Sequence, residues 1–334
     1  MESAAPVLSR RHEVGAGSAR GLLFTLLGEF VLPSEGAAWT SAVLAAFERL
    51  GVAEKATRQA LMRTSNAGWL QPEKVGRRTR WLLTSAATKL LGDGAKRIYS
   101  FGPATTWDGH WVLAQVRIPE ADRRARHVVR TRLAWAGFGS LAPGLWISPH
   151  ANRESEAIRV LTEAGVAGDA HVFVARRTGL SDTRAMVAAA WDLPQIEAEY
   201  EQFAAEFRAP EAPGDVLLRQ LELVHAWRRF PALDPSLPRE LLPPRWSGIR
   251  AAELFADRHQ RWLPDAHREW RRLNTVLSPL AAARLRPYLP ARRRALEAAA
   301  CSLVTQSLRS LTPQSAGSGA RFGSRGRGKC STNS

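Results

Sequence analysis

Cysteine is scarce in this sequence, because its 334 residues include only Cys301 and Cys330. Two cysteines exclude a zinc finger built from Cys-x-x-Cys pairs and provide no disulfide framework. Long apolar runs are also missing, since no segment approaches the roughly 20 residues that a membrane-spanning helix needs. The apolar segment 19–32 contains Arg20 and Glu29, and no small-residue cleavage site follows it. We therefore expect a cytosolic protein with no membrane partner.

Acidic residues are few relative to basic ones, with 31 Asp and Glu against 47 Lys and Arg, which gives a net charge of +16. The excess positive charge lies mostly in the first half of the chain and in residues 301–334. Such a distribution indicates a polyanionic partner. The sequence also has no nucleophile motif, no phosphate-cradling Gly-rich loop and no His-Glu-x-x-His pattern. We therefore expect a binding protein rather than an enzyme, with no cofactor and no bound metal.

The length is sufficient for two or three domains with their own cores. The expected class is α+β, with a winged helix-turn-helix, a central ferredoxin-like unit and a mostly helical unit. The predicted boundaries are a disordered tail 1–17, a winged-helix unit 18–94, a ferredoxin-like unit 95–180, a helical unit 181–300 and a basic disordered tail 301–334.

The most informative stretch runs from Ala53 to Thr84 and predicts a helix followed by a hairpin. At 3.6 residues per turn one face of the helix is small and uncharged, formed by Thr57, Ala60, Leu61 and Thr64. Gly68 ends the helix, and Gly76 turns the hairpin. Two further helices, 19–31 and 43–50, are expected before it.

The opposite face of this helix carries side chains that suit a DNA major groove. Arginine reaches guanine O6 and N7, and glutamine or asparagine reaches adenine N6 and N7. The predicted DNA-binding residues are Lys55, Arg58, Gln59, Arg63 and Asn66 on the helix, with Arg77, Arg78 and Arg80 on the hairpin beside the phosphates. The alternative is a solvated helix and turn, and Ala53-Glu54 offers no helix-capping side chain.

The second unit is expected to contain strands and helices in the order β-α-β-β-α-β, which is the ferredoxin-like split repeat. Its predicted elements are a strand 111–118, a helix 121–136, strands 138–141 and 145–148, a helix 154–163 and a strand 171–175. Beyond residue 182 we expect helices interrupted by prolines, including 196–207, 215–230 and 251–262. The proline-rich run 233–248 is too apolar for a linker and predicts a packed loop.

Four stretches together resemble the PaaX family of repressors of phenylacetate catabolism. The first is the predicted recognition helix with Gly68-Trp69-Leu70, and the second is the turn Gly76-Arg77-Arg78 leading to Leu83-Thr84. The third is Trp107-Asp108-Gly109 with Trp111 through Gly137-Phe138-Gly139-Ser140-Leu141-Ala142-Pro143-Gly144-Leu145-Trp146. The fourth is His225-Ala226-Trp227-Arg228-Arg229-Phe230-Pro231-Ala232-Leu233-Asp234-Pro235 through Leu237-Pro238. The last two are long and specific, and the resemblance covers roughly residues 18–275. It implies a dimeric repressor that an aryl acyl-CoA, typically phenylacetyl-CoA, releases from its operator.

The central unit also resembles the small ferredoxin-like nuclease subunit of CRISPR adaptation, which carries an aspartate at the end of its first strand. Here that strand ends in Val116-Arg117-Ile118, and Asp108 precedes it. The acid for two-metal chemistry is missing from its place, so a structural role in dimerisation is favoured. A metal-dependent nuclease and a constitutive DNA-binding protein without an effector remain the alternatives.

The effector site is predicted at His225, Arg228, Arg229 and Trp246, in a different unit from the DNA contacts. Guanidinium forks match the phosphate oxygens of CoA, although the two arginines are equally suited to a helix end. A single histidine on an apolar helix is more often packed and hydrogen-bonded than catalytic. Tryptophans at 107, 111, 146 and 246 offer stacking surfaces for an adenine or aryl group, although core packing is the simpler role for most of them.

Overall fold

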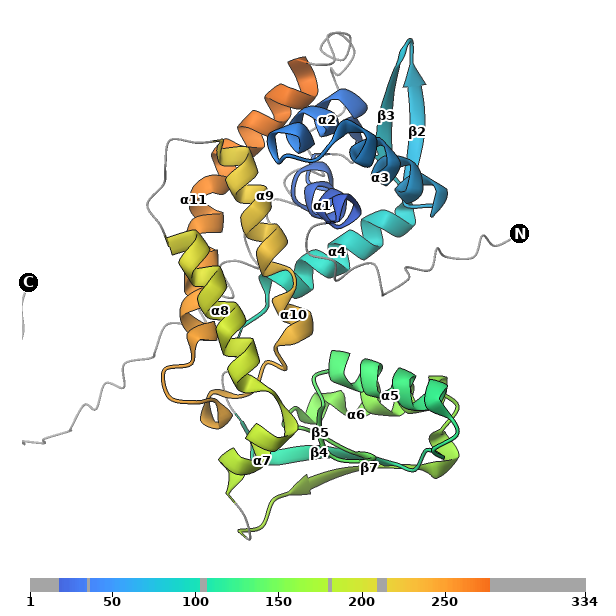
Figure 1. The fold of residues 1–334 in the computed structure, drawn as a ribbon, viewed down its shortest axis with the longest axis vertical. Coiled ribbons are helices and arrows are strands. Elements are labelled where there is room, and N and C mark those ends of the chain that lie inside the picture. Colours follow the sequence, from blue (N-terminus) through green and yellow to red (C-terminus); the bar gives the residue numbers. More distant parts are fainter. Residues whose placement is uncertain (1–17, 35–36, 103–106, 180–181, 209–214, 277–334) are drawn as a thin grey trace, which may run out of the picture.

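The structure is a computed structural model that describes residues 18–34, 37–102, 107–179, 182–208 and 215–276. The predicted tails 1–17 and 301–334, with both cysteines, lie outside these ranges. The α+β class is confirmed, because the described strands form two antiparallel sheets among many helices (Figure 1). Among these helices none is long and apolar enough to cross a membrane.

The first unit begins with α1 (Ala19–Leu26), which continues directly into one π-helical turn, η2 (Leu27–Val31). Ser18 caps α1, because its hydroxyl accepts a hydrogen bond from the Gly21 amide at 3.0 Å. The elements that follow are β1 (Ala37–Trp39), α2 (Thr40–Arg49), α3 (Glu54–Asn66), β2 (Leu70–Val75) and β3 (Arg78–Leu83). Strand β1 pairs with β3 and was not predicted, since three residues are too few to show an alternating pattern.

Helix α4 (Ser85–Tyr99) leaves the base of the hairpin and runs towards the middle of the molecule (Figure 1). The predicted boundary between residues 94 and 95 therefore falls inside a continuous helix. The helix passes through Gly92 and Gly94, since a glycine in a helix interior costs only about 1 kcal/mol. Helix α4 thus extends from the hairpin of the first unit to Tyr99, and a non-helical segment leads from there to β4 of the second unit.

The second unit has the predicted order of elements. They are β4 (His110–Val116), α5 (Arg123–Trp135), β5 (Gly139–Ala142), β6 (Leu145–Ser148), η3 (Ala151–Arg153), α6 (Glu154–Glu163), η4 (Ala167–Asp169) and β7 (Ala170–Arg176). The sheet order is β5-β6-β4-β7, and all neighbours are antiparallel. Helices α5 and α6 lie side by side on one face of the sheet (Figure 1).

The third unit is helical, as predicted, although its helices differ in extent. They are α7 (Thr183–Ala190), α8 (Leu193–Arg208), α9 (Val216–Trp227), α10 (Phe230–Leu233), η5 (Arg239–Leu241) and α11 (Ser247–Val276). Helix α11 continues through Pro264, where the sequence predicted an end, and Trp262, Ala266 and Trp270 are buried on both sides of that proline. The proline-rich loop is packed as expected, since Leu237, Leu241 and Trp246 are buried.

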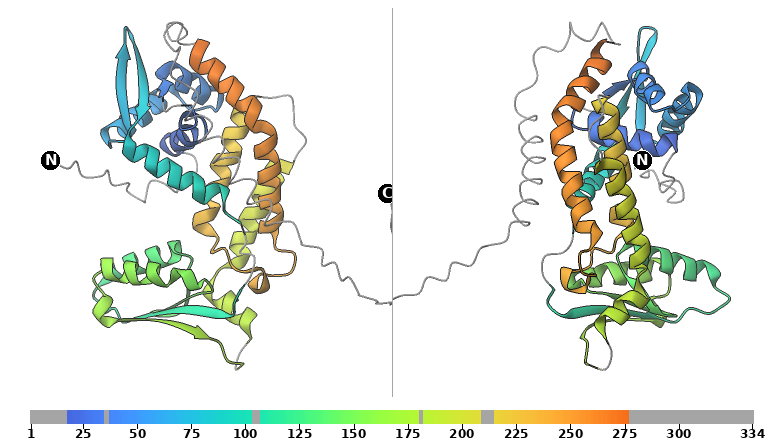
Figure 2. Two further views of the ribbon diagram at one scale, coloured as in Figure 1. Left: turned by 180° about the vertical axis from the view of Figure 1, so that it is seen from behind. Right: turned by 60° about the vertical axis from the view of Figure 1, so that its left-hand side comes forward.

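The first unit does not have a core of its own. Leu217 and Leu221 of α9 and Ala266 and Trp270 of α11 belong to the same buried cluster as α1, α2 and α3. The Phe30 and Trp270 rings lie 6.0 Å apart between centroids. Figure 2 shows α9 and α11 running alongside the first unit in both views. The third unit is therefore the support on which the first unit is packed.

Candidate nucleic-acid interface and effector region

The buried face of α3 is the one that the sequence predicts, because Thr57, Ala60, Leu61 and Thr64 are its buried residues. The side-chain hydroxyl groups of two of these residues donate hydrogen bonds to backbone carbonyls four residues earlier. The Thr64 hydroxyl donates to the Ala60 carbonyl at 2.7 Å, and the Thr57 hydroxyl donates to the Ala53 carbonyl at 3.3 Å. Small side chains and internal hydrogen bonds let α3 pack closely against α1 and α2, with its other face in solvent.

That outer face carries all five residues predicted to contact DNA from the helix, and each of them is exposed. Arg58 pairs with Glu54 at 2.7 Å, one helical turn away. An exposed ion pair of this kind stabilises a helix by about 0.3–0.5 kcal/mol, so Arg58 can leave Glu54 for another partner at little cost. Met62, which is 52% exposed, adds an apolar side chain to the same face.

The hairpin places its three arginines differently. Gly76 has a φ of +60°, and Gly76-Arg77 form the two-residue loop between the paired residues Val75 and Arg78. Arg77 and Arg78 are exposed at this tip. Arg80 instead lies directly opposite Glu73 and donates to both of its carboxylate oxygens, at 3.0 and 2.7 Å. In this structure Arg80 therefore supports the hairpin.

The four predicted effector residues do not line one pocket. Arg228, at the end of α9, donates to the Gly21 carbonyl at 3.1 Å and to the Thr25 hydroxyl at 3.3 Å, both on α1. His225 contacts the same hydroxyl at 2.8 Å through Nδ1. Arg229 pairs with Glu199 of α8 at 2.6 Å. Arg228 and His225 thus join the third unit to the first, so replacing either would also disturb the support of α1.

The environment of His225 fits the packed role that the sequence favoured. Burial is the largest effect that lowers the pKa of His225, and the charges of Arg228 and Arg229 lower it further, to about 4. The imidazole is therefore neutral at neutral pH. Trp246 is buried and borders a cavity of about 10 Å³, which has no room for an aryl ring. Trp111 and Trp146 are also buried, which confirms core packing for three of the four tryptophans considered.

A buried carboxylate forms a second junction between the units. Glu29, in the π-helical turn, accepts hydrogen bonds from Gln220 of α9 at 2.7 Å, from His259 of α11 at 3.0 Å, and from the Tyr99 hydroxyl of α4. Burial raises the pKa of Glu29, but the charge of His259 and these hydrogen bonds outweigh it and lower the pKa to about 2. The carboxylate is therefore ionised and holds four elements together.

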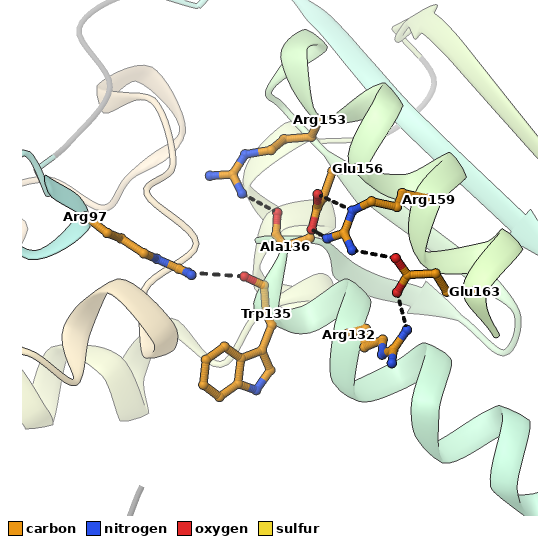
Figure 3. A network of polar contacts seen from close by, with 8 residues as sticks. All are labelled: Arg97, Arg132, Trp135, Ala136, Arg153, Glu156, Arg159 and Glu163. Atoms are coloured by element: carbon orange, nitrogen blue, oxygen red, sulfur yellow. Dashed lines mark hydrogen bonds and ion pairs between the residues drawn. The ribbon is translucent and has the colours of Figure 1, made fainter. Parts of the chain in front are cut away.

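One cavity of about 200 Å³ lies where α4, the end of α5 and the loop after α10 meet. Arg97 of α4 donates to the Pro231 carbonyl at 2.6 Å and to the Trp135 carbonyl at 3.3 Å. Arg153 donates to the Ala136 carbonyl at 2.8 Å (Figure 3). Sequence reasoning missed this pair, because the two arginines are far apart along the chain and belong to no motif.

The residue considered for metal-dependent chemistry is part of a turn. Asp108 is exposed and accepts a hydrogen bond from the His110 amide at 2.9 Å at the start of β4. Within the described ranges, no three His, Cys, Asp or Glu side chains gather closely enough to hold a metal ion. Asp108 therefore has a structural contact at the start of β4.

Three family descriptions, all of the PaaX family, match successive parts of the chain. The family descriptions "PaaX-like protein", "PaaX protein central Cas2-like domain" and "PaaX-like protein C-terminal domain" match residues 18–87, 104–187 and 191–272. The "Transcriptional repressor PaaX" of Escherichia coli (strain K12) is 33% identical over 271 residues, which cover 77% of this chain and 84% of that protein.

A solved structure shares the fold. The "Uncharacterized protein Rv0674 from Mycobacterium tuberculosis" superposes with a TM-score of 0.54 at 21% sequence identity. The match covers 77% of this chain and 99% of that one. At this identity the likeness concerns the fold and not the ligands.

Proposed function

The chain belongs to the PaaX family of transcriptional regulators, and on this premise we propose that it is a cytoplasmic, DNA-binding repressor of a phenylacetate-type catabolic operon. One observation carries the proposal. Helix α3 presents a basic, amide-bearing face to solvent while the other face is packed in the core, and an arginine-tipped hairpin stands next to it (Figure 1). A winged helix-turn-helix uses these two elements, with α3 in the major groove and the hairpin on the backbone.

Replacing Arg77 and Arg78 together with alanine is expected to weaken binding to all DNA sequences alike. These side chains lie at the hairpin tip, where phosphates rather than base edges are within reach. The slope of log K against log salt concentration should become shallower by about 0.9 for each phosphate that the variant no longer neutralises. Fluorescence anisotropy at several salt concentrations measures the slope. The Arg124→Ala variant, altered on the exposed face of α5, is the control, and an unchanged slope in the double variant would remove the hairpin from the interface.

We further propose that an aryl acyl-CoA such as phenylacetyl-CoA releases the protein from its operator. The thioester adds phosphate charges, an adenine and a long arm to an acid that carries a single charge. A ligand changes the conformational equilibrium only by its difference in affinity for the two states. The first and third units share one buried core and two polar junctions, at Glu29 and at Arg228, so a ligand that shifts the third unit can change the position of α3.

Micromolar phenylacetyl-CoA is expected to lower operator affinity by roughly 5- to 150-fold, the usual range of coupling between two sites. Phenylacetate at the same concentrations should leave the affinity unchanged. A DNA fragment selected from a random pool serves as operator, and anisotropy reports its release. Release by phenylacetate alone would contradict the acyl-CoA requirement, and no release by any aryl acyl-CoA would leave a constitutive DNA-binding protein.

We also propose that the active form is a homodimer, because helix-turn-helix repressors commonly read two half-sites related by two-fold symmetry. The edge strand β7 supports this proposal, since Phe173 and Val174 on it are 52% and 48% exposed. Sedimentation equilibrium of the pure chain tests it, and a monomer at micromolar concentration would contradict it.

A further inference from the structure

The cavity at the junction of the three units is lined by more positively charged than negatively charged side chains. Arg97 and Arg153 lie in its wall with Trp135 and Phe101. The acidic residue of the lining is Asp234, whose carboxylate already accepts hydrogen bonds from the Tyr200 hydroxyl and the Ser236 amide, each at 2.6 Å. The two guanidinium groups are thus the charges available to a ligand there.

Neighbouring arginines show how different this pair is. Arg159 donates to Glu156 and Glu163 at 2.6 and 2.9 Å, and Arg132 donates to Glu163 at 2.6 Å (Figure 3). Arg97 and Arg153 instead point towards backbone carbonyls. In the described part of the chain, neither has a carboxylate within ion-pair distance.

Burial and mutual repulsion make the positive charges of Arg97 and Arg153 unfavourable in this position. Burial lowers the pKa of both guanidinium groups, the charge of Arg153 lowers that of Arg97 further, and Glu156 offsets these effects only in part. Arginine stays protonated under these conditions, so proton loss does not relieve the cost. An anion placed between the two groups would offset both the burial and the mutual repulsion.

We propose that this cavity is an anion site that binds the phosphate groups of the effector through Arg97 and Arg153. The proposal rests on the proposed release by an acyl-CoA, and it places the charged end of that ligand. Guanidinium forks bind phosphate oxygens in pairs, which a carbonyl cannot equal in strength. The cavity of about 200 Å³ is open to solvent and smaller than the pocket that encloses a whole organic ligand. It therefore accepts the phosphates, and the remainder of the thioester extends from the mouth.

The position of Arg97 gives this site a direct mechanical connection to the DNA-binding elements. Helix α4 carries Arg97 near its end, and its N-cap is Thr84, immediately after hairpin strand β3. In this structure Arg97 ties α4 to Trp135 of the second unit and to Pro231 of the third. A phosphate that takes over these N–H groups removes both ties, which frees α4 and the hairpin to change position.

Ligand binding to the full chain without DNA tests the site directly. Isothermal titration with phenylacetyl-CoA, CoA, adenosine 3′,5′-bisphosphate and phenylacetate separates the phosphate contribution from that of the aryl group. We expect the first three to bind and phenylacetate to fail. Arg97→Gln and Arg153→Gln should each weaken phenylacetyl-CoA binding by roughly tenfold or more, as the loss of a charge-assisted hydrogen bond does.

Arg159→Gln is the matched control, because this arginine lies on α6, directly after the turn that carries Arg153, but is neutralised by two glutamates. Its affinity for phenylacetyl-CoA should stay within a factor of about two of wild type. Urea unfolding confirms that each variant is folded before it is titrated. Wild-type affinity in both cavity variants would overturn the site.

The outcomes also separate this site from the proposed function. If phenylacetyl-CoA releases wild type and both cavity variants from DNA equally, the release is real and the site is wrong. If the chain binds phosphate-bearing ligands through Arg97 and Arg153 but DNA affinity does not change, the site is real and the effector proposal fails. Absence of any binding by wild type contradicts both.

Discussion

Replacing Glu29 with glutamine is expected to lower the free energy of unfolding by about 1–3 kcal/mol at pH 7, because a buried ionised acceptor is replaced by a neutral one and its donors lose charge-assisted hydrogen bonds. Gln220, His259 and Tyr99 converge on this carboxylate from α9, α11 and α4. An amide keeps the size of the side chain but has one acceptor oxygen in place of two. The loss should appear in urea unfolding as a lower midpoint.

The pH dependence follows from the sign of the pKa shift. The folded-state pKa of Glu29 is about 2, below its ordinary value of 4.5, so the ionised carboxylate stabilises the fold above pH 4.5. This contribution falls as the pH decreases from about 4.5 towards 2. The difference in stability between wild type and Glu29→Gln should therefore be largest near neutral pH and shrink in acid.

Glu48→Gln provides the comparison, because Glu48 is an exposed carboxylate on α2 with no ion pair among the described residues. Such a surface change should stay within about 0.5 kcal/mol of wild type. If Glu29→Gln is as stable as this control at pH 7, the cluster does not hold the first unit to the third.

Replacing Gln59 or Arg58 with alanine is expected to cost about 1–3 kcal/mol of operator binding each and to relax preference at individual base pairs. Both side chains are exposed on α3, and the opposite face of the helix is fixed in the core by Ala60 and Leu61. The helix therefore has only one face to offer to a groove. Arg58 gives up its pair with Glu54 on binding, which is a small cost for an exposed pair.

Anisotropy titrations on a selected operator and on its single-base variants measure this effect. Gln195→Ala and Arg124→Ala change the same residue types on the third and second units, and both should bind the operator as wild type does. Wild-type affinity and wild-type base preference in the α3 variants would assign DNA reading to another element.

Local patterns explain why α3 and the hairpin were predicted correctly. Thr57, Ala60, Leu61 and Thr64 recur at the helical period, and Gly76 occupies the position where the turn requires a positive φ. Both signals lie within a short stretch of chain. The same holds for the order of elements in the second unit, whose strands and helices are each specified by nearby residues.

Interactions between distant segments were beyond the reach of these patterns. The motif around Arg228 was found, but its partners Gly21 and Thr25 lie at the other end of the described chain, on α1. Arg97 and Arg153 meet only because α4 continues through two glycines towards the second unit. Pro264 is likewise held inside α11 by the burial of the residues around it, which no local propensity reveals.

Selection of DNA from a randomised duplex pool, performed in parallel with wild type and with Gln59→Ala, tests the central claim most directly. We expect wild type to enrich one motif, and the variant to enrich the same motif with preference lost at one or two neighbouring positions. Identical motifs from the two proteins, or no motif from wild type, would contradict DNA reading by α3.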